Sequence, residues 1–262
     1  MKDGFVKTAA GTPDIKVADC GYNCARIKAI DKAHEQGVRV LVLPELCITG
    51  YTCQDLFFQQ TLLDGALNAL KDITEHSAGL DMLIAVGCPL RFRGELYNCA
   101  VVMKDGKILG VVPKKFLPNY NEFYEKRHFT AAPEGEYDIE LFGESVPFGL
   151  GLLFECRGTP ELVFAAEICE DLWAAEPPSI SLALGGATLI ANLSASNETI
   201  GKDSYRRELV NSQSARLLCG YVYASAGSGE STQDLVFGGH DIIAENGIVL
   251  AESKLYSTGL TV

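Results

Sequence analysis

Three side chains that could do chemistry together follow apolar stretches at points where strands would end. Glu45 lies in LVLPELCITG, Lys114 in VVPKKFLP and Cys169 in FAAEICEDLW. Strand ends in α/β folds direct side chains into a common site, so these three are candidates for one active site. Each motif alone also fits a structural role, as a solvated turn carboxylate, an exposed lysine pair or a buried cysteine.

Together the three residue types match the requirements of amide cleavage by a thiol. This reaction needs a base for the thiol proton, a cation or N–H group for the oxyanion, and an acid for the departing amine. Glu170 and Asp171 follow Cys169 and favour a helix start, which would place the sulfur near free backbone N–H groups. A Glu, Lys and Cys set supplies all of these groups without a histidine, and no histidine lies near Cys169 in the sequence.

Composition and charge argue against several other classes of protein. The 262 residues carry a formal net charge of −12 and no Lys/Arg-rich run, so nucleic acid and membranes are not expected as partners. No segment is apolar enough for a signal peptide or a membrane span, and we therefore expect a cytoplasmic protein. Nine cysteines without a C-x-x-C pair and four scattered histidines predict neither a disulfide framework nor a metal site. The sequence lacks the phosphate-binding loops G-x-G-x-x-G and G-x-x-x-x-G-K-[ST], so we expect no ATP or dinucleotide cofactor in this chain.

The elements that must position these side chains alternate between strand and helix patterns. Apolar runs typical of buried strands cover residues 38–43, 82–86, 162–168, 187–193 and 221–226. Helical spacing of apolar residues covers residues 17–36, 55–75 and 204–219. The dipeptides Asp105-Gly106 and Asn246-Gly247 predict hairpins over residues 98–112 and 237–252. These patterns indicate an α/β fold with mixed sheets, and the lack of a linker or repeat favours one domain over residues 1–262.

The three motifs together resemble the nitrilase, or carbon–nitrogen hydrolase, superfamily over essentially the whole chain. LPELCITGY fits its glutamate motif, PKKFLP its lysine motif and EICEDLW its cysteine motif, in this order. The resemblance implies a four-layer αββα sandwich and a catalytic triad of Glu45, Lys114 and Cys169. It selects Lys114 over Lys115, because the family pattern is lysine, any residue, aromatic, Leu, Pro.

The same resemblance extends into the irregular segment at residues 114–135, whose length without periodicity favours a functional loop. It implies a supporting second glutamate at Glu125 in YEKRHF, which would orient the catalytic lysine. Glu122 in the same segment is the less favoured alternative.

Finer features resemble one branch of the superfamily, the N-terminal glutaminase domain of glutamine-dependent NAD+ synthetase. The stretches that carry this likeness are NYNEFYEKRHF, NLSASN, YRRELVNSQSARLLCGYVYASAGSGEST and DLVFGGHDIIAENG. The resemblance implies L-glutamine as the substrate. Its binding pocket would be formed by Tyr51, Tyr120, Phe123, Glu170 and Ser196.

The branch also implies a biological role and partners. Ammonia from glutamine would serve NAD+ synthesis from deamido-NAD+ in a C-terminal synthetase domain, which would use ATP and Mg²⁺ and which we expect to be missing from this chain. Homo-oligomers are implied as well. Two alternatives stay open at this point, namely a free-standing ω-amide hydrolase of the same fold and a non-catalytic binding or assembly module.

Overall fold

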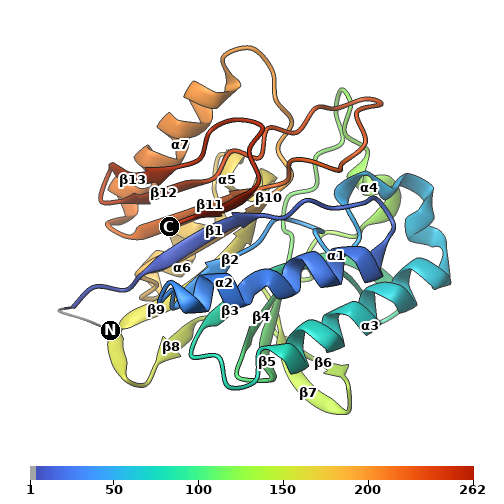
Figure 1. The fold of residues 1–262 in the computed structure, drawn as a ribbon, viewed down its shortest axis with the longest axis horizontal. Helices are drawn as coiled ribbons and strands as arrows, with labels where there is room; N and C mark the ends of the chain where they lie inside the picture. The colour runs from blue at the N-terminus through green and yellow to red at the C-terminus, as the bar shows by residue number, and fades with distance from the viewer. Residues whose placement is uncertain (1–3) are drawn as a thin grey trace.

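Two mixed β-sheets lie face to face in the computed structural model, which describes residues 4–262 (Figure 1). The eight strands of the first sheet are, in spatial order, β14 (Gly259–Thr261), β1 (Thr8–Thr12), β2 (Val40–Val42), β3 (Leu83–Phe92), β4 (Glu95–Lys104), β5 (Lys107–Pro113), β7 (Glu144–Phe148) and β6 (Tyr137–Leu141). The six strands of the second sheet are β13 (Ile248–Glu252), β12 (Ile242–Glu245), β11 (Gly220–Ser225), β10 (Leu189–Ser194), β9 (Thr159–Ile168) and β8 (Phe154–Cys156).

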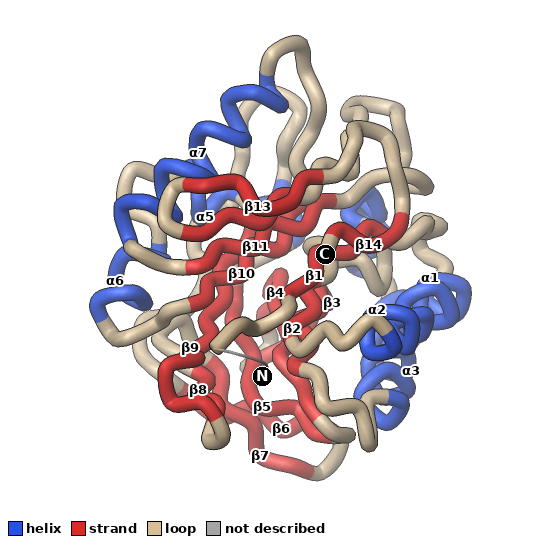
Figure 2. Tube along the Cα trace, turned by 60° about the vertical axis from the view of Figure 1, so that its left-hand side comes forward, coloured by secondary structure: helices blue, strands red, loops and turns tan. Residues whose placement is uncertain are grey.

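Helices cover the outer face of each sheet, so that the strands lie between two helical layers (Figure 2). The first sheet is covered by α1 (Cys20–Ile27), α2 (Asp31–Glu35) and α3 (Gln60–His76). The second sheet is covered by α5 (Glu170–Trp173), α6 (Pro178–Leu184) and α7 (Lys202–Leu217). The short helix α4 (Glu125–His128) and the 3₁₀ segments η1 (Lys28–Ile30) and η2 (Tyr51–Phe58) lie in connections.

Three apolar cores separate these four layers, and the strand period assigns side chains to them. In β3, Ile84 and Val86 pack against the first helical layer, whereas Ala85 faces the other sheet. In β10, Ala191 faces the first sheet and Ile190 packs under the second helical layer. Both faces of each sheet are therefore buried, which explains the continuous apolar runs in the sequence. The predicted αββα sandwich with mixed sheets is confirmed.

Most of the predicted elements are present within a few residues of their expected positions. Both predicted hairpins form, and their turn residues Asp105, Gly106, Asn246 and Gly247 all have positive φ, as the favoured two-residue turns require. The helix expected at residues 17–36 tightens into a 3₁₀ turn at η1, and the one expected at residues 55–75 begins only at Gln60, after extended Gln59. No helix within residues 4–262 combines the length and apolar character needed to cross a lipid bilayer.

The parallel strands bring the ends of three chain segments to one place. β1, β2 and β3 are parallel neighbours in the first sheet, and β9, β10 and β11 are parallel neighbours in the second. Glu45 follows the carboxyl end of β2, Cys169 follows β9 and Ala195 follows β10. Because carboxyl ends of parallel strands meet at one edge of a sheet, the face-to-face packing gathers these residues between the two sheets.

Candidate active site

A buried lysine joins two buried glutamates at the centre of the site. The Nζ atom of Lys114 lies 2.6 Å from Glu45 Oε1 and 2.6 Å from Glu125 Oε1. The side chains of Lys114 and Glu45 are fully buried, and that of Glu125 nearly so. Lys114 follows the end of β5 and Glu125 begins α4, so the irregular segment folds back onto the strand that precedes it.

Glu45 is held by donors from both sheets. Asn98 of β4 donates from Nδ2 to Glu45 Oε1 at 2.6 Å, and the backbone N–H of Ala195 donates to Oε2 at 2.9 Å. Gly87 of β3 passes directly beneath this turn, because a Cβ atom there would lie 2.2 Å from the backbone nitrogen of Leu46. Only glycine allows so close an approach, and the carboxylate is therefore fixed by strand, turn and partner sheet together.

Burial and mutual charge set the protonation of this cluster. Burial alone would lower the pKa of Lys114, but the charges of Glu125 and Glu45 raise it well above its usual value. Burial raises the pKa of Glu125 to about 7, although the charge of Lys114 acts in the opposite direction. A buried ion cluster of this kind is costly unless its charges are paired, and Lys114 contacts both carboxylates, although Glu125 Oε2 is buried without a hydrogen-bond partner.

Cys169 occupies a strained turn between β9 and α5. Its backbone has φ 44° and ψ −101°, a conformation that residues with a Cβ atom rarely adopt. Its N–H donates to Leu193 O at 3.0 Å and to Asn192 Oδ1 at 3.1 Å, which ties the turn to β10. Asp171 accepts from the N–H of Ile168 at 3.0 Å and so closes the turn from the other side. Such strain at a candidate nucleophile is typical of functional turns.

The Cys169 thiol lies within the electrostatic field of the buried cluster. Burial raises the pKa of this thiol, the charge of Glu45 raises it further, and the charge of Lys114 opposes both. The thiol is therefore protonated at neutral pH in the unliganded site. A base must remove its proton before it can act as a nucleophile.

The residues predicted to bind substrate gather at the edge of this cluster. Tyr51 donates from its hydroxyl to Glu125 Oε1 at 2.9 Å, and Tyr120 donates to Glu170 Oε1 at 3.0 Å. The rings of Tyr120 and Phe123 lie 5.7 Å apart in an edge-to-face contact. Tyr51, Phe123 and Glu125 line a cavity of about 30 Å³. Ser196, the last predicted pocket residue, is buried just after β10.

The two alternatives weighed in the sequence lie elsewhere. The ammonium group of Lys115 lies 4.9 Å from the centre of the Phe116 ring. Glu122 accepts from Asn197 Nδ2 at 2.6 Å. Each therefore has a partner outside the buried cluster of Glu45, Lys114 and Glu125.

Sequence reasoning missed one cation near the site. The Nζ atom of Lys202, at the start of α7, lies 5.0 Å from the Trp173 ring centre and donates to Asn197 Oδ1. Burial lowers the pKa of Lys202, whereas charges on Cys169 and Glu170 would raise it. Because it lies 32 or more positions from either residue in the chain, no local motif could have indicated it.

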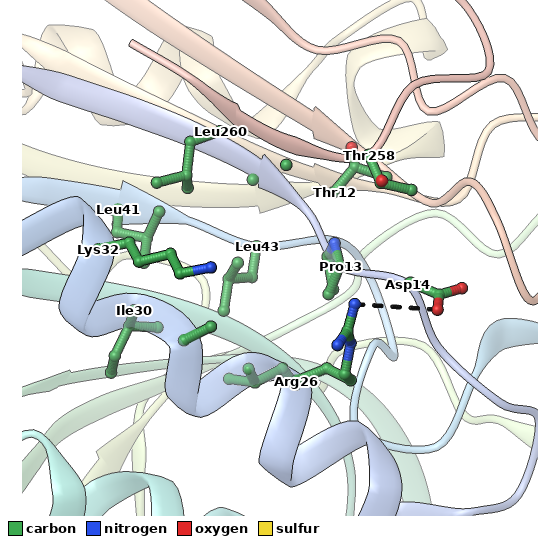
Figure 3. Close-up of a pocket in the computed structure, with 14 residues that line it drawn as sticks. Thr12, Pro13, Asp14, Arg26, Ile30, Lys32, Leu41, Leu43, Thr258 and Leu260 are labelled. Atoms are coloured by element: carbon green, nitrogen blue, oxygen red, sulfur yellow. Dashed lines mark ion pairs between the residues drawn. The ribbon is translucent and has the colours of Figure 1, made fainter.

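A larger cavity of the structure lies away from these residues. The cavity in Figure 3, of about 190 Å³, lies between the α1–α2 segment and strands β1 and β14. Arg26 and Lys32 line it, and Arg26 pairs with Asp14 at 4.0 Å. Both cations are exposed and no predicted site residue contributes to the cavity. Among residues 4–262, no three His, Cys, Asp or Glu side chains are grouped so as to hold a metal ion.

Comparison with known proteins identifies the family of this chain. Residues 7–262 match the model of the carbon-nitrogen hydrolase family, and the chain belongs to this family. It is 45% identical over 258 residues to the glutamine-dependent NAD(+) synthetase of Mycobacterium tuberculosis (strain H37Rv), covering 98% of this chain and 38% of that protein. The chain thus spans less than two fifths of the length of this relative.

Solved structures agree with that class. The crystal structure of a glutamine-dependent NAD(+) synthetase from Cytophaga hutchinsonii superposes with a TM-score of 0.87 at 30% identity, over 98% of this chain and 42% of that one. An amidase of the nitrilase superfamily from Nesterenkonia gives a TM-score of 0.76 at 19% identity, over 98% of this chain and 88% of that one. The second likeness shows the shared fold alone.

Proposed function

We propose that this chain hydrolyses the side-chain amide of L-glutamine through a cysteine thioester. The observation that carries this proposal is the contact of Lys114 Nζ with Glu45 and Glu125 at 2.6 Å each, in the electrostatic field that also acts on the Cys169 thiol. A base, a cation and a thiol are groups that amide cleavage by a thiol requires.

In the proposed reaction Glu45 takes the thiol proton as the Cys169 sulfur attacks the amide carbon. Lys114 and the backbone N–H of Glu170 stabilise the negative oxygen of the tetrahedral intermediate. The C–N bond then breaks, Glu45 returns the proton to the departing nitrogen, and ammonia leaves a glutamyl thioester. Glu45 next activates a water molecule, which attacks the thioester and releases glutamate and the free thiol. Glu125 holds the ammonium of Lys114 in place throughout.

The charged end of glutamine would be bound by groups of opposite sign. Glu170, already paired with the Tyr120 hydroxyl at 3.0 Å, offers a carboxylate to the substrate α-ammonium group. Lys202 offers an ammonium to the α-carboxylate, because its charge couples to Glu170 and Cys169, whereas Lys114, which also couples to both, is already held by Glu45 and Glu125. Tyr51, Phe123 and Ser196 would complete the pocket with ring surface and hydroxyl groups.

The relatives named as glutamine-dependent NAD(+) synthetases support a role for the released ammonia. We propose that it amidates deamido-NAD+ in a synthetase domain of the kind present in longer relatives, and that ATP and Mg²⁺ act there rather than in this chain. Residues 1–262 by themselves should release ammonia and form no NAD+. Homo-oligomers are proposed on the same resemblance, with light scattering as the test, and a 28.3 kDa monomer would contradict them.

Selective labelling tests the proposed nucleophile. A glutamine-derived chloromethyl ketone should modify Cys169 alone among the nine cysteines, as read by peptide mass spectrometry, and glutamine should release ammonia. Cys156 provides the internal control, because it is more exposed than the other cysteines. Labelling of another cysteine, or full activity in Cys169→Ala, would exclude this mechanism. Preference for simpler amides would indicate a free-standing amidase, and absence of both turnover and labelling a binding module.

A further inference from the structure

One fully buried arginine contacts the loop that carries part of the proposed substrate pocket. Arg206 of α7 donates from Nη1 to Glu198 Oε2 at 3.0 Å and contacts His240 Nδ1 at 2.8 Å. Its Nη2 donates to Asn197 O at 3.2 Å and to Ser196 Oγ at 3.4 Å. A buried guanidinium is expensive unless it is paired, so its position needs a reason beyond the stability of α7.

The contacts of Arg206 converge on one short loop, residues 195–198, that follows β10. The loop touches the proposed base at its first residue, since Ala195 donates to Glu45 Oε2 at 2.9 Å. Ala195 itself is held by the strand, because the preceding Ser194 carbonyl accepts from the N–H of Ala226 at 2.9 Å. Ala195 is therefore fixed independently of Arg206.

The next three residues of the loop have fewer backbone partners, namely an antiparallel bridge between Asn197 and Phe237 and the N–H of Glu198, which donates to Val236 O at 2.6 Å. Side chains supply their other contacts. Asn197 contacts both Glu122 of the irregular segment and the ammonium of Lys202. Glu198 pairs with Arg206 and is itself almost fully buried. The loop thus carries a proposed substrate hydroxyl, Ser196, and the partner of the proposed carboxylate-binding lysine, while the planar guanidinium contacts all three residues. A rigid fork of donors fixes such a loop in one geometry, as a flexible ammonium cannot.

A second set of contacts, through His240, fixes the orientation of the Arg206 guanidinium. Arginine has no acceptor atom, so His240 Nδ1 must accept from it and His240 Nε2 must carry the proton. That proton is donated to Glu252 Oε1 at 2.6 Å. Burial lowers the pKa of His240, in keeping with this neutral form. The chain of contacts from β13 through His240 to Arg206 leaves the guanidinium one orientation.

We infer that Arg206 is a positioning residue that sets specificity for the α-amino-acid end of the substrate, through the loop that holds Ser196 and Asn197. This inference rests on the proposed glutaminase function. Arg206 touches neither the thiol nor the buried cluster, so its loss should weaken recognition of the amino-acid group more than it slows the chemistry at Cys169.

The test compares Arg206→Lys, which retains the buried charge, with Arg216→Lys, an exposed position on the same helix. In Arg206→Lys we expect the KM for glutamine to rise about tenfold and kcat to change less than about threefold, since hydrogen bonds at the binding end are lost. Labelling of Cys169 by the glutamine-derived chloromethyl ketone should slow about tenfold, whereas labelling by iodoacetamide, which lacks the amino-acid group, should change less than about twofold. Arg216→Lys should match the wild type in all four measurements.

Each outcome bears on the inference. Equal slowing of both labelling reactions in Arg206→Lys, or a fall in kcat with KM unchanged, would overturn the inference even if the wild type hydrolyses glutamine. A wild type that neither releases ammonia nor reacts with the chloromethyl ketone would overturn the proposed function and this inference together. If Arg206→Lys does not fold, His240→Asn keeps the arginine but removes its link to Glu252. A KM increase for glutamine in that variant supports the inference, and an unchanged KM overturns it.

Discussion

The ammonium of Lys114 lies 2.6 Å from the carboxylate of Glu125, and both groups are buried from solvent. This contact closes the irregular segment over the end of β5 and leaves Lys114 charged beside Glu45. Glu125→Gln removes one negative charge from that contact and replaces one carboxylate oxygen by an NH₂ group, which cannot accept from the Lys114 ammonium. Lys114 should therefore shift from its position. We expect kcat for glutamine to fall about 10- to 100-fold with the protein still folded. Glu134→Gln, at an exposed glutamate of the same segment, is the matched control in the ammonia assay, and equal kcat values in both variants would contradict the role of Glu125.

Gly87 should be irreplaceable because the Glu45 turn lies against it. In Gly87→Ala the new Cβ would lie 2.2 Å from Leu46 N and 2.4 Å from Pro44 O, so backbone atoms must move. We expect a loss of about 1–3 kcal/mol in the free energy of unfolding together with reduced ammonia release. Gly158→Ala, where no atom lies within 4 Å of the added carbon, is the control for the chemical change alone. Urea unfolding of both variants measures the difference, and similar midpoints would show that the turn is free to shift.

Strain at Cys169 predicts an unusual order of stability among inactive variants. Both Cys169→Gly and Cys169→Ala remove the thiol, but only glycine adopts φ 44° with ψ −101° without strain. Cys169→Gly should therefore be more stable than Cys169→Ala by about 1 kcal/mol, against the usual preference for alanine. Thermal or urea unfolding provides the measurement. A more stable alanine variant would mean that this turn relaxes once the sulfur is absent.

Lys202 should affect affinity for glutamine more than turnover. Lys202→Met keeps most of the side-chain volume but removes the cation proposed to bind the substrate carboxylate. We expect the KM for glutamine to rise about tenfold or more, since a charged hydrogen bond is lost, while kcat changes little. Lys254→Met replaces an exposed lysine and should leave both constants unchanged. A lower kcat at constant KM in Lys202→Met would place this lysine in the chemical step instead.

A buried carboxylate away from the site should make stability depend on pH. Burial raises the pKa of Asp241 to about 7, although Thr12 and Ser225 donate hydrogen bonds to it. Because the folded-state pKa exceeds the unfolded one, the folded protein binds the proton more tightly, and its stability falls as pH rises from about 4 to about 7. Asp241→Asn lacks this titration, so its stability relative to the wild type should improve between pH 5 and pH 8. Urea unfolding at both pH values measures this change, and a constant difference would contradict it.

Local sequence patterns were sufficient to predict an element where one segment determines its own structure. The dipeptides Asp105-Gly106 and Asn246-Gly247 predicted hairpins because their backbone conformations are set by the residues themselves. The strands β1 and β14 were not predicted, since TAAGT and GLT are short and carry small or few apolar residues. They form by pairing with each other and, for β1, also with β2. Pairing between chain ends leaves no trace in the periodicity of either segment.

The sequence by itself determined the residue types at the strand ends, and with them the α/β class and the family resemblance. Only the tertiary structure decided which atoms meet: the Ala195 N–H donates to Glu45 across two sheets, although 150 positions separate the two residues. It likewise decided that Lys202 and Arg206, on one helix, face the site from the second sheet's side. The physical reason is that hydrogen bonds and ion pairs act over a few ångströms in space, and the packing of two sheets sets those distances for residues that no local pattern connects.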